Sequence, residues 1–231
     1  MHIYCIHIDI ALDKIKYNDF IPYISPEKRA KINRYKNEID KIRSLFGDLI
    51  IRYILCKYYG FHNNEVNYEY EELGKPYLKN HKNLHFNISH SGEWVVGIVS
   101  RNTVGIDIEK VTDIKQNLTS FVFSNEENYT FSHLIEMEKN EFFFKLWTLK
   151  ESYVKAKGSG LSEGLNTLNI YKENDEIRLK KEGKLVKAYF ETLDCIEGYK
   201  FSFCSVRKFN NFDIKLYAID EFYQEVKKLL N

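Results

Sequence analysis

The sequence has few of the features that mark disulfide-linked, zinc-binding, membrane and secreted proteins. Its 231 residues include only four cysteines and three prolines, and no two cysteines have the C-x-x-C spacing of a zinc or redox site. No apolar run approaches the roughly 20 residues of a membrane-spanning helix. The stretch MHIYCIHIDIALDK has no basic start and reaches Asp9 too early for a signal peptide. We therefore expect a cytoplasmic protein with reduced cysteines and no membrane partner.

A strong charge of either sign is also missing. The chain has 34 basic and 33 acidic side chains, which leaves a formal net charge of +1. This balance argues against a strongly basic nucleic-acid-binding protein. What is present is the composition of a folded protein, with 44% hydrophobic and 29% charged residues. The length is enough for one large domain or two small ones.

The order of the predicted elements indicates an α+β fold made of two similar halves. A strand, a long helix and several strands appear in residues 1–103, and the same order returns in residues 104–231. The long helices are predicted over residues 37–60, with Gly60 as the C-cap, and about 138–157, ending at a Gly-Ser-Gly break. The run IHIDI near the N-terminus also echoes VGIDI. We expect a pseudo-twofold duplication, each half a long helix packed on a small, mostly antiparallel sheet.

The run VGIDIEK at residues 104–110 sets two carboxylates side by side. On a strand, residues i and i+2 point to the same face, so Asp107 and Glu109 are neighbours while Ile106 and Ile108 face the core. A cation between the two carboxylates removes their repulsion, and hard oxygen ligands of this kind suit Mg²⁺. An ordinary amphipathic strand with its polar face in water explains the same pattern.

The run WTLKESYVKAKGSG at residues 147–160 places Glu151 and Lys155 one helical turn apart on one face. Such pairs are common on protein surfaces, where each contributes roughly 0.2–0.5 kcal/mol. This helix also carries a broad stripe of aromatic and aliphatic residues, so we expect it to be mostly buried. A buried charge at Glu151 then needs a partner, and a metal held by Asp107 and Glu109 would serve.

Three further features have both a structural and a functional interpretation. His90 lies between two serines in a predicted turn, where it is either solvated or part of a phosphate site. A short helix predicted to begin at Ser25 carries a basic run, which is usually a solvated face. Ser124 and Glu127 form an S-x-x-E capping box at a helix start, and capping alone explains this glutamate.

The runs NISHSGEW, VGIDIEK and FFKLWTLKESYVKAKGSGL, in this order and spacing, closely resemble the 4′-phosphopantetheinyl transferases. The resemblance is to the longer class, single chains of two similar halves of the type that activates the surfactin synthetase. It starts near SPEKRAK, continues through LGKP and covers most of the chain. It implies a monomer with its active site between the halves. Coenzyme A would bind to residues 1–103, and the metal and the carrier protein to residues 104–231.

The resemblance also implies roles for individual residues. The Mg²⁺ ligands map onto the carboxylates Asp107, Glu109 and Glu151. The lysine that closes the second motif and helps at the reacting phosphate maps onto Lys155, with Lys150 beside it. The contacts with coenzyme A, as substrate, map onto Lys28, Lys31, Ser44, Lys75, Pro76, Ser89, His90, Lys150 and Lys155. Leu73 stands where the surfactin-type relative has an aromatic residue, so an adenine contact from this position is not expected.

The implied reaction moves phosphopantetheine from coenzyme A to a serine hydroxyl of an apo peptidyl or acyl carrier protein and releases 3′,5′-ADP. Glu151 is the first candidate for the acceptor of the serine proton, and Glu127 is the second. By analogy, residues 158–165 and 121–131 are predicted to form the edge on which the small acidic carrier docks. Two alternatives stay open: another Mg²⁺-dependent enzyme acting on phosphates, and a non-catalytic binding module.

Overall fold

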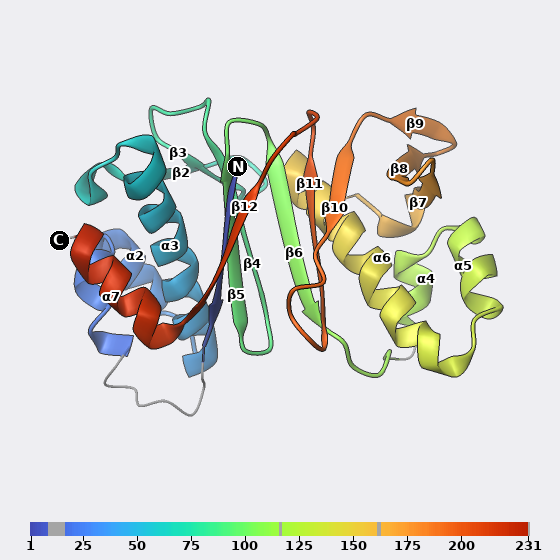
Figure 1. Cartoon of the computed structure of the whole chain (residues 1–231), viewed down its shortest axis with the longest axis horizontal. Coiled ribbons are helices and arrows are strands. Elements are labelled where there is room, and N and C mark those ends of the chain that lie inside the picture. The colour runs from blue at the N-terminus through green and yellow to red at the C-terminus, as the bar shows by residue number, and fades with distance from the viewer. Residues whose placement is uncertain (9–16, 116, 161–162, 231) are drawn as a thin grey trace. The chain divides into compact units, whose positions relative to one another are not determined.

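The chain forms two compact units in its computed structural model, which describes residues 1–8, 17–115, 117–160 and 163–230 (Figure 1). The first unit comprises Met1–Tyr70, Pro76–Arg101 and Asn211–Asn231, and the second comprises Glu71–Lys75 and Asn102–Asn210. The units differ from the expected halves at residues 71–75, 102–103 and 211–231. The division near residue 103 stays a prediction.

The first unit contains a four-stranded sheet with the order β12-β1-β5-β4. Its strands are β1 (His2–His7), β4 (His85–Ser91), β5 (Trp94–Ser100) and β12 (Asp213–Ala218). Neighbouring strands are antiparallel except for β1 and β12, which are parallel. In its described segments this unit includes the helices α2 (Pro26–Ile32), α3 (Glu38–Tyr59) and α7 (Ile219–Leu229), with 3-10 turns η1 (Ile21–Tyr23) and η2 (Asn63–Glu65). A separate antiparallel pair joins β2 (Tyr68–Tyr70) to β3 (Pro76–Leu78).

The second unit contains two antiparallel three-stranded sheets. The first has the order β10-β11-β6, from β6 (Val104–Lys110), β10 (Tyr189–Thr192) and β11 (Tyr199–Ser205). The second joins β7 (Leu168–Glu173), β8 (Glu176–Lys181) and β9 (Lys184–Val186). The helices are α4 (Leu118–Val122), α5 (Asn125–Ser132) and α6 (Glu136–Lys157), and η4 (Leu165–Thr167) is a 3-10 turn. Figure 1 shows α6 running along the sheet of β6 and β11, with which it makes extensive contact.

Local sequence signals explain where the helices begin and end. The two long helices, α3 and α6, each span 22 residues and end at a left-handed glycine, Gly60 with φ 75° and Gly158 with φ 74°. Glycine adopts this conformation without steric cost, and it closes the last turn of a helix. The Ser25 side chain accepts a hydrogen bond from the Lys28 amide at the start of α2. The predicted ends of the two long helices, the start of α2 after Ser25 and the α+β class are confirmed, while α6 begins two residues earlier than predicted.

Each unit has its own hydrophobic core. In the first unit, Phe46, Leu49 and Ile50 of α3 are buried together with Tyr4 and Ile6 of β1. In the second unit, α6 contributes a set of buried side chains that includes Phe143, Leu146, Leu149 and Val154. The expectation that this helix is mostly buried is confirmed for the part from Phe143 to Ala156, whereas its first turn is exposed. Burial of its apolar stripe fixes which side of α6 faces the rest of the unit.

One local prediction is wrong, because His90 lies inside β4, opposite Val95 of β5, and not in the turn between these strands. The run KLVKAYF has a strand-like pattern throughout, but the structure divides it between β9 and β10. The strand-like run near residue 213 is β12 and pairs with β1 of the first unit. A strand's own pattern does not identify a partner some 200 residues away, so this pairing could not be predicted.

Three remaining expectations concern membrane-spanning helices, the state of the cysteines and the sequence echo between the two halves. No helix in the part of the chain that the structure describes is long and apolar enough to cross a membrane. The four cysteines, all in described segments, have free thiols. Residues Asp9 and Ile10 of the echo between the two halves lie outside the described residues.

Candidate active site

Helix α6 approaches strand β6 closely at a glycine. A Cβ atom placed on Gly105 would overlap the backbone of Ser152 and of Ala156. A larger residue would therefore force the helix away from the strand. Gly105 belongs to the G-I-D motif, and its role here is packing: it lets the helix that carries Glu151 lie directly on the strand that carries Asp107.

Asp107 is buried and is paired with this helix. Lys155 Nζ donates a hydrogen bond to Asp107 Oδ1 at 2.5 Å. Only 2% of the Asp107 surface is exposed. The interpretation of VGIDIEK as a strand with its polar face in water is therefore wrong for this residue. A carboxylate at this depth requires a positive partner, and Lys155 provides one.

Glu151 lies near the same two charges. Burial, together with the negative charge of Asp107, raises the pKa of Glu151, while the positive charge of Lys155 opposes this shift. The structure thus brings Asp107, Glu151 and Lys155 together. Glu109 lies on the same face of β6 as Asp107 because the two alternate with the core residues of that strand, and its side chain is half-buried.

The donor chemistry of these residues fits a hard divalent cation. Asp107, Glu109 and Glu151 offer only carboxylate oxygens, which are the ligands that Mg²⁺ prefers. Within the described segments, however, no group of three or more His, Cys, Asp or Glu side chains stands in a metal-binding arrangement. At Asp107 the ammonium of Lys155 takes part of the carboxylate that a cation would bind. Burial and, secondly, repulsion from Asp107 raise the pKa of Glu151, and a bound cation would favour the charged carboxylate against both.

Lys150 lies apart from this group although it precedes Glu151 in the chain. Its side chain is 0% exposed. The ammonium donates to the backbone oxygens of Val122 at 2.5 Å and Leu165 at 3.1 Å, and to Glu127 Oε2. Burial lowers the pKa of Lys150, and the charge of Glu127 opposes that shift. The expected contact between Lys150 and coenzyme A stays a prediction.

Glu127 is the partner of Lys150 and also the capping residue of α5. The capping box is complete, because the Ser124 amide donates to Glu127 Oε2 at 2.8 Å and the Glu127 amide donates to Ser124 Oγ at 3.3 Å. In addition, the Ile170 amide of β7 donates to Glu127 Oε1 at 2.7 Å. The capping interpretation is confirmed, and the structure adds an ion pair and a contact with β7.

Lys75 forms a hydrogen bond at the C-terminal end of α6. Its Nζ donates to the carbonyl oxygen of Ala156 at 2.5 Å, where a helix leaves carbonyl groups without intrahelical partners. Burial lowers the pKa of Lys75, and Glu71 opposes the shift. A Cβ on Gly158 would come within 2.9 Å of the Lys75 side chain. Gly158 therefore both ends the helix and leaves room for this lysine.

The other residues expected to contact coenzyme A belong to the first unit. They are Lys28 and Lys31 of α2, Ser44 of α3, Pro76 of β3, and Ser89 and His90 of β4. Burial lowers the pKa of Lys28, while Asp48 raises it. Lys31 Nζ donates to the hydroxyl of Tyr70 at 3.4 Å. Leu73, in the second unit, is 65% exposed.

Two charged clusters were not predicted from the sequence. Asp48 and Arg52 form a buried ion pair on α3, with a distance of 2.7 Å between Arg52 Nε and Asp48 Oδ2. Their i,i+4 spacing inside an apolar run is a signal that could have found them. Glu163, also buried, accepts hydrogen bonds from Ser159 at 2.5 Å, Lys181 at 2.6 Å and Lys157 at 3.3 Å. Nothing in the local sequence indicates this second cluster.

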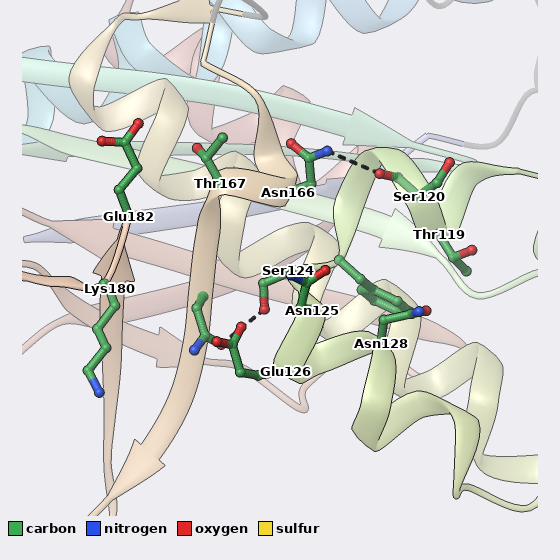
Figure 2. Close-up of a pocket in the computed structure, with 13 residues that line it drawn as sticks. Thr119, Ser120, Ser124, Asn125, Glu126, Asn128, Asn166, Thr167, Lys180 and Glu182 are labelled. Carbon is green, nitrogen blue, oxygen red and sulfur yellow. Dashed lines mark hydrogen bonds between the residues drawn. The ribbon is translucent and has the colours of Figure 1, made fainter.

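A polar pocket of about 770 Å³ lies on the second unit, among α4, α5, η4 and β8 (Figure 2). Figure 2 shows hydroxyl and amide side chains around it, and the Asn166 side chain donates to the Ser120 carbonyl oxygen at 3.2 Å. Two helices of its wall also carry exposed aromatic residues, Phe121 with 69% and Tyr129 with 70% of the surface exposed. Both lie within the predicted docking range 121–131. Residues 161–162 of the other predicted range lie outside the described residues.

Comparison with known proteins gives matches over almost the whole chain. A family model described as "4′-phosphopantetheinyl transferase, N-terminal" matches residues 13–102, and one described as "4′-phosphopantetheinyl transferase superfamily" matches residues 103–204. The chain is 32% identical to the 4′-phosphopantetheinyl transferase Sfp of Bacillus subtilis over 96% of its own length and 99% of that protein. It is 35% identical to the 4′-phosphopantetheinyl transferase gsp of Aneurinibacillus migulanus, over 84% of this chain and 81% of that one.

Among solved structures, the holo-[acyl-carrier-protein] synthase of Thermotoga maritima matches 46% of the chain and 64% of that protein. The identity is 21% and the TM-score is 0.38.

Proposed function

The chain belongs to the 4′-phosphopantetheinyl transferase superfamily, and from this premise we propose how its residues carry out the transfer. It is an enzyme that transfers phosphopantetheine from coenzyme A to carrier proteins. The alternatives of another Mg²⁺-dependent phosphate enzyme and of a non-catalytic binding module are not favoured. The observation that carries the mechanism is the group formed by the buried Asp107 and the half-buried Glu151 and Lys155.

The reaction is a substitution at phosphorus. The serine oxygen of the apo carrier forms a bond to the phosphorus that bears the pantetheine arm. The bond from this phosphorus to the oxygen of the 3′,5′-ADP group breaks, and 3′,5′-ADP leaves. A diphosphate resists attack because its oxygens are anionic, so catalysis depends mainly on neutralising charge and on positioning the reactants.

Asp107, Glu109 and Glu151 would hold Mg²⁺, which supplies positive charge to the diphosphate. The all-carboxylate donor set and the raised pKa of Glu151 support this proposal. Lys155 neutralises charge at the reacting phosphorus, and its hydrogen bond to Asp107 supports this placement. Coenzyme A itself is a substrate and not a resident cofactor.

The serine proton needs an acceptor, and two carboxylates were considered. Glu151 is half-buried, and its raised pKa brings it closer to the range in which a carboxylate accepts a proton effectively. Glu127 already accepts hydrogen bonds from Ser124, Ile170 and Lys150. We therefore propose Glu151 as the acceptor. Glu127, the second candidate from the sequence, is less suited because its oxygens already accept these bonds.

Charge supports the proposed contacts with coenzyme A. Lys28, Lys31 and His90 would hold its phosphates, including the 3′-phosphate, with Ser44, Ser89 and Pro76 completing the set. Lys28 lies near the buried pair of Asp48 and Arg52, which limits where its ammonium can go. Lys75 remains in the proposed set, although it donates to a backbone oxygen. The three donors of Lys150 are all engaged inside the protein, so we leave Lys150 out of this set.

The wider biological setting is also a proposal. The two units are proposed to derive from a pseudo-twofold duplication. This is supported by a 22-residue helix in each, ending at a left-handed glycine. The protein would act as a cytoplasmic monomer, without nucleic acid or membrane, on carrier domains of nonribosomal peptide, polyketide or fatty-acid synthesis. Antibiotic biosynthesis is one such setting. The free thiols support a reducing compartment.

Mass spectrometry of an apo carrier domain tests the reaction and the metal site together. The protein is incubated with coenzyme A, Mg²⁺ and a peptidyl or acyl carrier, beside an Asp107→Asn variant. We expect the mass gain of one phosphopantetheine arm with the unmodified protein, and its loss in EDTA and in the variant. A gain that survives both EDTA and the substitution would overturn the metal site but not the transfer. No gain on any carrier would overturn the transfer itself.

A further inference from the structure

Lys150 is the most deeply buried charged residue of α6, the helix that carries Glu151. Its side chain has no exposed surface, and its three partners are Glu127 Oε2 and the backbone oxygens of Val122 and Leu165. An ammonium group has three protons to donate. All three therefore have acceptors within the protein, and none is left for a phosphate of the substrate.

The partner carboxylate is equally engaged. Glu127 is 3% exposed, and it receives the amides of Ser124 and Ile170 in addition to Lys150. Through these bonds the pair joins α6 to the end of α4, the start of α5, the turn η4 and strand β7. Four separate segments thus converge on the pair of Lys150 and Glu127.

The position of this junction along α6 is informative. Successive residues of an α-helix point about 100° apart around its axis, so Lys150 and Glu151 face different sides. Lys150 is held by α4, α5 and η4, while Glu151 lies near Asp107 of β6. On the side of β6, Gly105 lets the backbone of Ser152 and Ala156 rest on the strand. The helix is therefore held on two sides, immediately before and immediately after Glu151.

We propose that Lys150 and Glu127 are a pair of positioning residues that set the rotation and depth of α6, so that Glu151 faces Asp107, and that neither contacts coenzyme A or the carrier serine. A buried ion pair with these extra hydrogen bonds has one arrangement that satisfies every partner. Rotation or sliding of the helix would leave a charge unpaired in the interior, which is strongly unfavourable. The pair thus resists the small movements that would displace Glu151. This inference rests on the proposed role of Glu151.

A double-substitution cycle separates positioning from contact with substrate. The variants are Lys150→Met, Glu127→Gln and the two combined, with kcat, both KM values and the Mg²⁺ concentration for half-maximal rate measured for each. We expect each single variant to lower kcat about 100-fold, the size of effect that a 1 Å displacement of a reacting group produces. KM for coenzyme A should stay within about twofold, and the half-maximal Mg²⁺ concentration should rise. The combined variant should recover at least about tenfold in kcat over the worse single variant, because no buried charge is then left unpaired.

Lys145→Met on the exposed side of the same helix is the matched control, and we expect it to change none of these values. If Lys150→Met does not fold, as judged by thermal melting, the kinetic constants of Glu127→Gln and of the combined variant are compared instead. A rise in KM for coenzyme A with unchanged kcat in Lys150→Met would overturn the proposal and make Lys150 a substrate contact. A combined variant whose kcat is no higher than that of the worse single variant would also overturn the proposal. Asp107→Asn alters the proposed metal ligand and its bond to Lys155 but leaves Lys150 and Glu127 unchanged, so a failure there is distinguishable from a failure here.

Discussion

Lys155 Nζ and Asp107 Oδ1 lie 2.5 Å apart, so a lysine of α6 binds the carboxylate that is also the proposed metal ligand. The ammonium neutralises Asp107 while no metal is bound. It also competes with a metal for the same oxygen atoms and repels it by like charge. The same lysine is proposed to act on the reacting phosphorus. These two roles predict opposite effects when its charge is removed.

In a Lys155→Gln variant, Mg²⁺ should therefore bind about 3- to 10-fold more tightly in the absence of coenzyme A. The same variant should lose about 100- to 1000-fold in kcat, because a charge that stabilises the transition state is gone. Isothermal titration calorimetry measures the first effect and carrier modification the second. Lys145→Gln, also on α6, should change neither. Weaker Mg²⁺ binding in Lys155→Gln would show that Lys155 supports the metal and does not compete with it.

Gly105→Ala should destabilise the second unit and slow the reaction. The added methyl group would overlap backbone atoms of Ser152 and Ala156, which can move only with the helix. We expect the free energy of unfolding to fall by about 1–3 kcal/mol, as for other overpacked sites, and kcat to fall with it. Urea denaturation and a transfer assay give the two values. Gly164→Ala, whose Cβ would first meet only the Asn166 side chain, should stay within about 0.5 kcal/mol of the unmodified protein.

The helices and the acidic motif could be predicted because their signals are local. Gly60 and Gly158 end the long helices, and Ser25 and Ser124 begin two others, through bonds that span only a few residues. The pairing of β12 with β1 could not be predicted, since it joins residues some 200 positions apart. Periodicity identifies the buried face of a strand and not its neighbour.

Within the candidate site, the sequence predicted which kinds of side chain are present better than it predicted which of them are in contact. It placed Asp107, Glu151 and Lys155 on elements that meet, and the structure brings these three together. It did not distinguish Lys150 from Lys155, two lysines of one motif. One is enclosed by backbone oxygens and Glu127, and the other faces Asp107. That difference depends on which side of the helix is packed, a property of the tertiary fold.

The buried carboxylate Glu163 should make stability depend on pH. Burial by itself would raise its pKa, but hydrogen bonds from Lys181, Ser159 and Lys157 outweigh this and hold the pKa below its usual 4.5. A lowered pKa means that the carboxylate stabilises the fold above about pH 4.5, and that this contribution is lost as the pH falls through the folded-state pKa. Glu163→Gln should thus cost about 1–2 kcal/mol at pH 7 and much less near pH 3.

Urea denaturation of both proteins across this pH range measures the difference. The exposed Glu136, paired with Lys139 on the surface of α6, gives the matched control, and Glu136→Gln should show a small difference at every pH. The difference in free energy of unfolding between Glu163→Gln and the unmodified protein should not stay constant from pH 7 to pH 3 if the prediction holds. A constant difference would show that the carboxylate charge is not the source of the stability.

The exposed aromatic residues of α4 and α5 give a prediction for recognition of the carrier. Phe121 and Tyr129 are 69% and 70% exposed, and aromatic side chains are enriched in protein–protein interfaces relative to the rest of the surface. Phe121→Ser should raise KM for the carrier about tenfold, equivalent to about 1.4 kcal/mol of binding energy. Its kcat and its KM for coenzyme A should stay within about twofold, because the residue lies on a different element from Asp107, Glu151 and Lys155. Steady-state kinetics with each substrate varied in turn separates these values.

Leu185→Ser on β9 is the matched control for that substitution, because it removes an apolar side chain that is 64% exposed in the same unit. It should leave all three kinetic constants unchanged. If Phe121→Ser and Tyr129→Ser both leave KM for the carrier unchanged, the carrier binds elsewhere on the protein. If they raise KM for coenzyme A instead, these aromatic rings belong to the binding of the nucleotide substrate. An increase confined to the carrier would place its docking edge on α4 and α5.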